Sequence, residues 1–243
     1  MRSKKISRIF YFTALNLFLI CSAQDTRGDI VVVNFDSLDT STSSVTGSAL
    51  DSYLAGYGIT ISNVSPSGYP EVYSENSSGG FWPGYATASS GTNFLAHGDG
   101  VPGGNFNYIN NPISFRLNFS TLLNSFEFTR IQIDGRPSPS GIVLAGWQAR
   151  ALNSSGTTIA TVGEGQFGSY GIIAAKTFTL NGPNIKSVVI ERNYTNTYAG
   201  TNTVLIDDFK LNAVPEPTGL AMLCPLLGGI AALRRRRTET ATK

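Results

Sequence analysis

Three aspartates near the two ends of the central region have the residue type and placement expected of a calcium site. Asp36 follows the first predicted strand, and Asp207 and Asp208 lie within the last one. Because side chains alternate along a strand, Asp207 shares a face with Phe209 and Leu211 and is predicted to point inward. An inward carboxylate is costly unless it is paired or bound to a metal.

Carboxylate oxygens completed by backbone carbonyls suit Ca²⁺, so we expect a structural calcium ion held by these three aspartates. The alternative is that Asp207 pairs with an arginine or caps a strand end. Asp99 is a weaker candidate, since the segment around it offers a single acid.

A second group of candidates is aromatic. Residues 69–85 carry five aromatic rings among glycines, prolines and serines, which predicts a long loop. Exposed rings stack on the apolar faces of sugars, so Tyr73, Trp82 and Tyr85 are candidate ligand-binding residues. The alternative is that the loop folds its own rings beneath it as a satellite cluster.

Catalytic candidates are sparse, and we predict that the protein is not an enzyme and has no catalytic residues. A Ser-His-Asp triad would need the single histidine, His97, as its base, but the sequence contains no G-x-S-x-G turn to present a nucleophilic serine. The carboxylates Glu71, Glu127 and Glu164 are the residues that a hydrolase or lyase would use. A glycosidase needs two carboxyl groups roughly 5–10 Å apart, which sequence does not establish.

Charge and cysteine content change once the two ends are set apart. The chain of 243 residues has a formal net charge of +2, but residues 24–217 hold nine basic and 15 acidic residues. Nucleic acid is therefore an improbable partner, because binding phosphates needs clustered lysine and arginine. Both cysteines, Cys21 and Cys224, also lie in the ends, so the body has neither disulfide nor thiolate chemistry.

The N-terminus has the three parts of a secretory signal peptide. Basic residues over 2–8 precede an apolar run over 9–20, and small residues end at Ala23. This order predicts a signal peptide over 1–23 with cleavage before Gln24. The alternative is a lipoprotein acylated at Cys21, although the residues before that cysteine fit poorly.

The C-terminus predicts a membrane segment. Val214-Pro215-Glu216-Pro217 is followed by 16 uncharged residues over 218–233 and then by four arginines, Arg234, Arg235, Arg236 and Arg237. Arginine stems extend a short span by reaching toward the headgroups. Basic residues stay cytoplasmic, which places the tail 238–243 in the cytoplasm and the body on the far side. An ordinary tail anchor or a packed terminal helix is the alternative.

This order of motif, apolar span and arginine cluster over 214–237 resembles the PEP-CTERM sorting signal of bacterial exosortase substrates. The resemblance implies export through the inner membrane, with transient anchoring there. It further implies recognition of Pro215, Glu216 and Pro217 by an exosortase-type membrane protease. The product would then reach the cell surface or extracellular matrix, in bacteria that make extracellular polysaccharide and biofilm.

The body over 24–213 must supply the elements that position these residues. Apolar residues recur with a period near 2 and turn residues every 8–15 positions, as in Val31, Val33 and Phe35 or in Phe126 and Phe128. A bulge is expected near residues 129–130, Trp147 is expected in the core, and no long amphipathic helix is expected.

We therefore predict an all-β fold, an antiparallel β-sandwich of the jelly-roll type, between the signal peptide and the C-terminal transmembrane sorting helix. Its layout is similar to carbohydrate-binding-module jelly rolls. The predicted function is an exported surface or matrix protein that binds or embeds in polysaccharide. The alternatives are a polysaccharide-active hydrolase or lyase, and a purely structural matrix protein without a specific ligand.

Overall fold

A computed structural model describes residues 30–65, 69–76, 86–98, 114–135, 146–165, 171–192 and 204–215 of the chain. All of these except Pro215 belong to one compact unit, Asp29–Val214. The predicted signal peptide, the apolar span 218–233 and the arginine cluster 234–237 lie outside the described residues. The one helix among the described residues is not long and apolar enough to cross a membrane.

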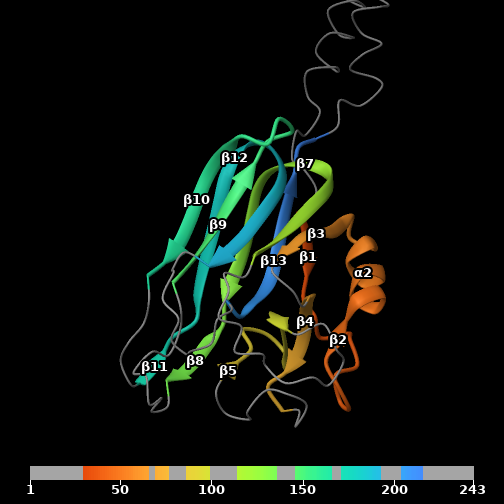
Figure 1. Cartoon of the computed structure of the whole chain (residues 1–243), viewed down its shortest axis with the longest axis vertical. Coiled ribbons are helices and arrows are strands. Elements are labelled where there is room, and N and C mark those ends of the chain that lie inside the picture. Colours follow the sequence, from red (N-terminus) through yellow and green to blue (C-terminus); the bar gives the residue numbers. More distant parts are fainter. Residues whose placement is uncertain are drawn as a thin grey trace, which may run out of the picture. The chain divides into compact units, whose positions relative to one another are not determined.

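The secondary structure confirms the prediction of an all-β domain, since the described residues form thirteen strands and one helix (Figure 1). Their bounds are β1 (Ile30–Val33), β2 (Val45–Thr46), α2 (Gly47–Ala55), β3 (Ile59–Ser65), β4 (Tyr69–Ser74), β5 (Ala86–Thr87), β6 (Asn93–Gly98), β7 (Ser114–Arg130), β8 (Gln132–Gly135), β9 (Trp147–Leu152), β10 (Thr158–Glu164), β11 (Gly171–Ile173), β12 (Lys176–Arg192) and β13 (Ile206–Ala213).

All the strand pairs are antiparallel. Ten strands form one sheet in the order β10-β9-β12-β7-β13-β6-β4-β2, with β1 paired to β13 and β3 paired to β7. A second sheet has the order β11-β8-β5.

Two strands of 17 residues, β7 and β12, organise the domain. They pair from Ser114 with Glu191 to Arg130 with Lys176, and the register shifts between Asn181 and Ser187. The first half of β7 also pairs with β3, whereas the second half pairs with β13. The two strands therefore run through both halves of the large sheet.

Ring contacts show that these two halves face each other. Trp147 of β9 lies beside the end of β12, yet its ring centroid is 5.7 Å from that of Phe128 and 4.9 Å from that of Phe178, at the opposite end of the β7–β12 pair. Phe119 and Phe126, on either side of the middle of β7, are 5.4 Å apart. The β7–β12 pair thus folds over and contributes to two layers, as in a β-sandwich.

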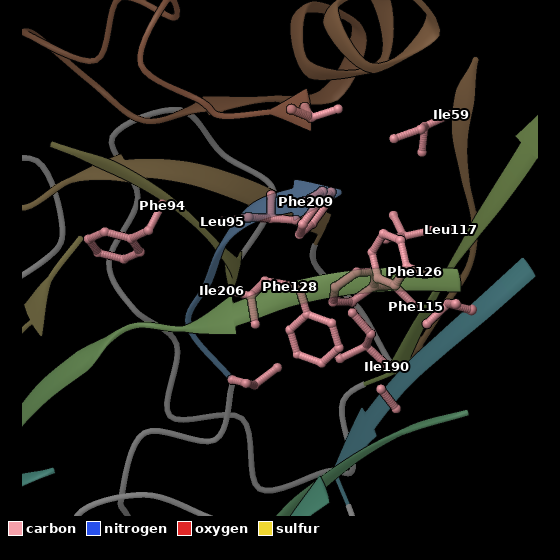
Figure 2. Packing of buried hydrophobic residues seen from close by; sticks show 14 of the residues in the cluster. Ile59, Phe94, Leu95, Phe115, Leu117, Phe126, Phe128, Ile190, Ile206 and Phe209 are labelled. Atoms are coloured by element: carbon pink, nitrogen blue, oxygen red, sulfur yellow. The ribbon is translucent and has the colours of Figure 1, made fainter. Parts of the chain in front are cut away.

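The core lies between these layers (Figure 2). The ring of Phe209 is 5.3 Å from that of Phe35 and 5.2 Å from that of Phe126, so β13, β1 and β7 meet there. Trp147 is 2% exposed, which confirms its predicted place in the core. Burial of such large apolar side chains, each stabilising by about 1.5–3 kcal/mol, is what offsets the entropy of folding in a body without cysteine.

Next to the bulge expected near residues 129–130, the register of β13 on β7 shifts between Asp207 and Lys210, opposite Thr129 and Glu127, and the chain then changes sheet. β7 ends at Arg130, the Ile131 N–H donates to the Leu205 carbonyl, and β8 then pairs with β11 and β5 in the small sheet. The apolar alternation changes phase at this point because the chain leaves one sheet for the other.

The helix α2 was not predicted, because its apolar face is short. It has nine residues, with Leu50 and Leu54 both fully buried one turn apart. Two apolar positions are too few to give a helical period in the sequence. The helix is fixed by packing, since the Tyr53 ring lies 6.1 Å from the Phe35 ring.

Candidate functional site

The outer side of one layer carries a row of polar side chains that we call the arginine face: Arg116, Asn118, Gln148, Arg150 and Glu191. Strand alternation produces it. In β7, Phe115, Leu117 and Phe119 are buried in the core, so the two residues that alternate with them, Arg116 and Asn118, point outward and are half-exposed. In β9 the buried Trp147, Ala149 and Ala151 alternate in the same way with Gln148 and Arg150.

Glu191 of β12 joins two members of this face. The Arg150 Nε donates to Glu191 Oε1 at 2.7 Å and Nη2 donates to Oε2 at 3.2 Å, a bidentate ion pair. Gln148 Nε2 also donates to Glu191 Oε1 at 2.6 Å. The hydrogen bond from Arg150, followed by the one from Gln148, holds the pKa of Glu191 below its ordinary value despite partial burial.

Arg116 lies near the centre of the face. Strand register aligns it with Ser62 of β3 on one side and, through Val189 of β12, with Arg150 of β9 on the other. Its Nε is buried, and the described residues offer it no hydrogen-bond partner. Beside it, Asn118 Nδ2 donates to Ser62 Oγ at 2.9 Å.

The predicted calcium ligands Asp207 and Asp208 both accept hydrogen bonds from the segment Ser89–Asn93. Ser89 Oγ donates to Asp207 at 3.0 Å and to Asp208 at 2.8 Å. Ser90 Oγ donates to Asp208 at 2.6 Å, and the Ser90 N–H donates to Asp207 at 3.2 Å. Asp207 is fully buried, as predicted, but the register shifts between Asp207 and Lys210 and pairs Asp207 with Thr129. It therefore does not share the face of Phe209 and Leu211, because the shift interrupts the alternation of side chains along β13.

Asp36 holds the other end of the same segment. Its Oδ1 accepts hydrogen bonds from the backbone N–H of Thr92 at 3.1 Å and of Asn93 at 3.4 Å. The buried Asn93 side chain fastens the segment further, since its Nδ2 donates to the Phe35 carbonyl at 2.9 Å and to the Leu38 carbonyl at 3.0 Å. Asp36 therefore contacts one end of the segment Ser89–Asn93, and Asp207 and Asp208 contact the other.

Burial dominates the electrostatics of Asp207. It raises the pKa from 3.8 to about 6, and the neighbouring Asp208 adds to the rise, against hydrogen bonds from Asp208, Ser90 and Ser89 that lower it. No ion pair reaches Asp36, Asp207 or Asp208 within the described ranges. In the same part of the chain, no three His, Cys, Asp or Glu residues are grouped closely enough to hold a metal ion.

The structure corrects the aromatic prediction at Tyr73. Residues 69–74 form strand β4 rather than a loop, between β2 and β6, and the Tyr73 side chain is fully buried. Its ring lies 6.3 Å from that of Phe94 in the core, so it is not available for stacking on a sugar. Trp82, Tyr85 and Asp99 lie outside the described residues.

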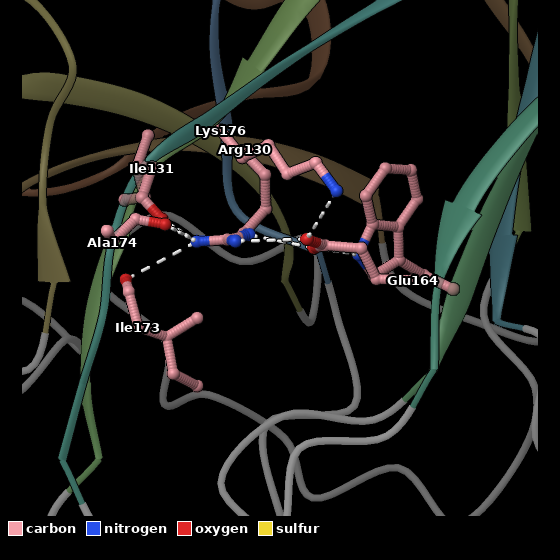
Figure 3. A network of polar contacts seen from close by, with 7 residues as sticks. Arg130, Ile131, Glu164, Ile173, Ala174 and Lys176 are labelled. Atoms are coloured by element: carbon pink, nitrogen blue, oxygen red, sulfur yellow. Dashed lines mark hydrogen bonds and ion pairs between the residues drawn. The ribbon is translucent and has the colours of Figure 1, made fainter.

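Two of the three glutamates weighed for catalysis are in ion pairs on different strands. Glu127 accepts from Lys210 Nζ at 2.7 Å on the outer side of the second layer. Glu164, whose side chain is 7% exposed, accepts from Arg130 Nε at 2.9 Å (Figure 3). Glu71 is fully buried and accepts from Ser44 Oγ at 2.7 Å.

The arginine face was not predicted, although the outward direction of two of its residues can be read from the sequence of β7 alone. Arg116 and Asn118 alternate with apolar residues in a predicted strand, which marks them as outward-facing. Their grouping with Arg150 and Glu191 depends on which strands are neighbours, and strand order is not local.

No protein-family model and no curated protein matches the chain. Solved structures similar to it include the arabinose-bound MgGH51 α-L-arabinofuranosidase, with a TM-score of 0.43, 11% identity and coverage of 78% of this chain and 27% of that one. The chain therefore spans about a quarter of that enzyme's length. The CBM22-1 xylan-binding domain of Xyn10C from Paenibacillus barcinonensis has a TM-score of 0.36 at 13% identity, over 79% of this chain and 98% of that one. The K1 cleaved adhesin domain of Lys-gingipain from Porphyromonas gingivalis W83 has a TM-score of 0.36 at 12% identity, over 76% and 99%.

Proposed function

We propose that this protein is an exported, non-catalytic polysaccharide-binding protein of the bacterial cell surface or matrix, built on a jelly-roll sandwich. The observation that supports this most is the arginine face. Planar amide, carboxylate and guanidinium groups lie there on three adjacent strands, β7, β12 and β9. Such groups donate to and accept from sugar hydroxyls, and a rigid sheet fixes their spacing.

The partners of the glutamates favour binding over hydrolysis. A general acid must give up a proton, but Glu164 receives two hydrogen bonds from Arg130 and one from Trp147 Nε1 at 3.2 Å. The Glu164 side chain is thus occupied by contacts within the protein and is only 7% exposed. Glu127 forms an ion pair with Lys210 on a different surface from Glu164, so the two carboxylates do not form a catalytic pair.

We further propose that the C-terminal signal is processed as in exosortase substrates. β13 ends at Ala213, the Val214 N–H donates to the Leu122 carbonyl at 2.8 Å, and Pro215 is the last described residue. The motif residues Pro215, Glu216 and Pro217 thus begin directly after the last strand of the domain. This placement suits a membrane protease that must recognise the motif beside a folded body.

Calcium remains a proposal for the segment Ser89–Asn93. Asp36, Asp207 and Asp208 would supply carboxylate oxygens, and the ion would compensate the buried charge of Asp207. Calcium is expected to raise the melting temperature of the purified chain, and Asp207→Ala or Asp36→Ala is expected to remove the rise. Melting curves that do not change with calcium or chelator would contradict this site.

Polysaccharide binding is tested by retention of the purified full-length chain on a panel of bacterial and algal polysaccharides. Saturable retention is expected on at least one of them. Asn118→Ala and Gln148→Ala should each weaken it several-fold, because each removes hydrogen bonds to the ligand. Asn181→Ala is the matched control, since Asn181 is exposed in β12 near the fold of the β7–β12 pair. Absence of retention on every polymer would contradict the proposal and leave the purely structural role.

A further inference from the structure

Arg116 differs from the other basic residues of the domain. The structure describes the side chains of six lysines and arginines. Five of them have a carboxylate or carbonyl acceptor within 3.8 Å: Arg130, Arg150, Lys176, Lys186 and Lys210. Arg116 makes no hydrogen bond or ion pair with a described residue, and its Nε is buried.

The remaining charges on the arginine face leave Arg116 as an excess positive charge. Arg150 and Glu191 neutralise each other through their bidentate pair, at 33% and 22% side-chain exposure. The strand neighbours of Arg116 are uncharged, namely Ser62 in β3 and Val189 in β12. Glu191 already accepts three hydrogen bonds, one from Gln148 and two from Arg150, so its carboxylate does not serve as the counter-ion of Arg116.

A guanidinium that is partly removed from water and has no acceptor is costly, and a ligand that supplies an anionic acceptor recovers this energy. A carboxylate fits best, because its two oxygens match two parallel N–H groups of arginine. A sugar hydroxyl offers a single neutral acceptor and gains less. The body as a whole is acidic, with nine basic against 15 acidic residues over 24–217, so a polyanion is not attracted by overall charge.

We propose that the arginine face binds an acidic polysaccharide, with Arg116 pairing with the carboxylate of a uronic acid residue while Asn118 and Gln148 contact hydroxyl groups. This inference rests on the proposed polysaccharide binding and adds the chemical class of the ligand. It also assigns separate roles to the two arginines: Arg150 fixes Glu191 and Gln148, and Arg116 contacts the ligand's charge.

The test compares polymers that differ only in the charge of their carboxyl groups. Polygalacturonate and alginate are each offered to the purified full-length chain with free, ionised carboxylates (the acid form) and with esterified carboxyl groups (the ester). Affinity is measured by calorimetry. We expect at least one acid form to bind about tenfold or more tightly than its ester, because only the acid form can make a charge-assisted pair with Arg116. This preference should decrease as salt is raised.

Variants test whether the preference for the acid form over the ester depends on Arg116. Arg116→Gln should reduce it to roughly twofold or less, and Arg116→Lys should keep the attraction to charge but lose much of the bidentate gain. Lys210→Gln removes the same charge from the outer side of the other layer, where Lys210 pairs with Glu127, and should leave the preference unchanged. A cooperative melting transition well above the temperature of the binding measurement establishes that each variant is folded. If Arg116→Gln does not fold, Arg116→Lys and the comparison of acid with ester carry the test.

The outcomes separate the two proposals. Equal binding of acid and ester forms would overturn the acidic ligand while leaving polysaccharide binding in place. Loss of the preference in Lys210→Gln as well would overturn the assignment to Arg116. Arg116-dependent binding of a sulfated polymer, with no binding of either uronate, would overturn the carboxylate assignment. No binding to any polysaccharide would contradict the proposed function itself.

Discussion

Gly91, in the segment Ser89–Asn93, lies directly against the Asp36 carboxylate. Gly91 has φ of +48°, in the left-handed region that favours glycine, and a Cβ added there would lie 1.9 Å from Asp36 Oδ1. The glycine thus allows the Asp36 carboxylate to approach the backbone and accept from Thr92 and Asn93. The residue type at position 91 is therefore set by the aspartate that precedes it by 55 positions in the chain.

Gly91→Ala is expected to be more destabilising than Gly156→Ala. Gly156 also has positive φ, +78°, but a Cβ there meets nothing within 4 Å, so alanine adds only backbone strain of about 1–2 kcal/mol. At position 91 the same strain is joined by displacement of Asp36 and loss of its hydrogen bonds. Urea unfolding of both variants checks this, and equal losses would show that Asp36 moves aside freely.

Arg130 and Glu164 join elements of the two layers at the ends of β7 and β10. Arg130 is 2% exposed and also donates from Nη1 to the carbonyl of Ala174 at 2.7 Å, which connects the chain beyond β11 to the large sheet (Figure 3). Lys176 adds a longer contact to Glu164 at 3.8 Å. A buried ion pair is weak support for stability when both partners are replaced, but removal of one partner leaves an uncompensated charge.

Arg130→Met is therefore expected to lower the free energy of unfolding by about 3–5 kcal/mol. The double variant Arg130→Met with Glu164→Leu should lose much less than the sum of the two single variants. Lys210→Gln, which breaks an ion pair at the surface with 52% and 27% exposed side chains, should lose about 1 kcal/mol or less. Equal losses for Arg130→Met and Lys210→Gln in urea unfolding would contradict the role of the buried pair.

The start of β13 makes stability depend on pH through Asp207. Its pKa rises from 3.8 to about 6 on folding, so between these values the folded chain binds more protons than the unfolded chain. The contribution of this group to stability is therefore lost as pH rises from about 4 to about 6, by an amount on the order of 3 kcal/mol.

Unfolding measured in chelator over pH 4 to 7 should show this decrease, and Asp207→Asn should remove it. Saturating calcium should reverse the slope in the parent chain, because metal binding favours the ionised carboxylate. An identical pH dependence of the parent and Asp207→Asn in chelator would contradict the assignment to Asp207.

The whole chain divides its charge between the ends and the body. The basic residues at the two ends flank apolar runs, and they account for the formal net charge of +2 over an acidic body. If the ends serve export, the mature protein is more acidic than the encoded one and loses both cysteines.

In a host that carries an exosortase, the chain is expected to appear outside the inner membrane without residues 1–23 and without the arginine cluster. Glu216→Ala should leave the chain in the membrane fraction with its arginines intact, because the recognition motif is lost. Mass spectrometry of the two fractions measures this. Normal release of Glu216→Ala would contradict processing at the motif.

The sequence alone was sufficient for properties that depend on neighbouring residues. Alternation along each strand predicted an all-β domain and placed Trp147 in the core, because side-chain direction in a strand has a period of two residues. The same alternation could not show that Tyr73 is buried. Both faces of β4 are covered, and a strand covered on both faces has no alternating pattern.

Tertiary structure decided which strands became neighbours. The folding of the β7–β12 pair brought Trp147 onto Phe128, pairing of β12 with β9 brought Glu191 to Arg150, and Asp36 met Thr92 across 56 positions. Each of these contacts closes a long stretch of chain and depends on global strand order. For the same reason the lack of a partner at Arg116, on which the proposed ligand rests, becomes visible only once every neighbouring strand is in place.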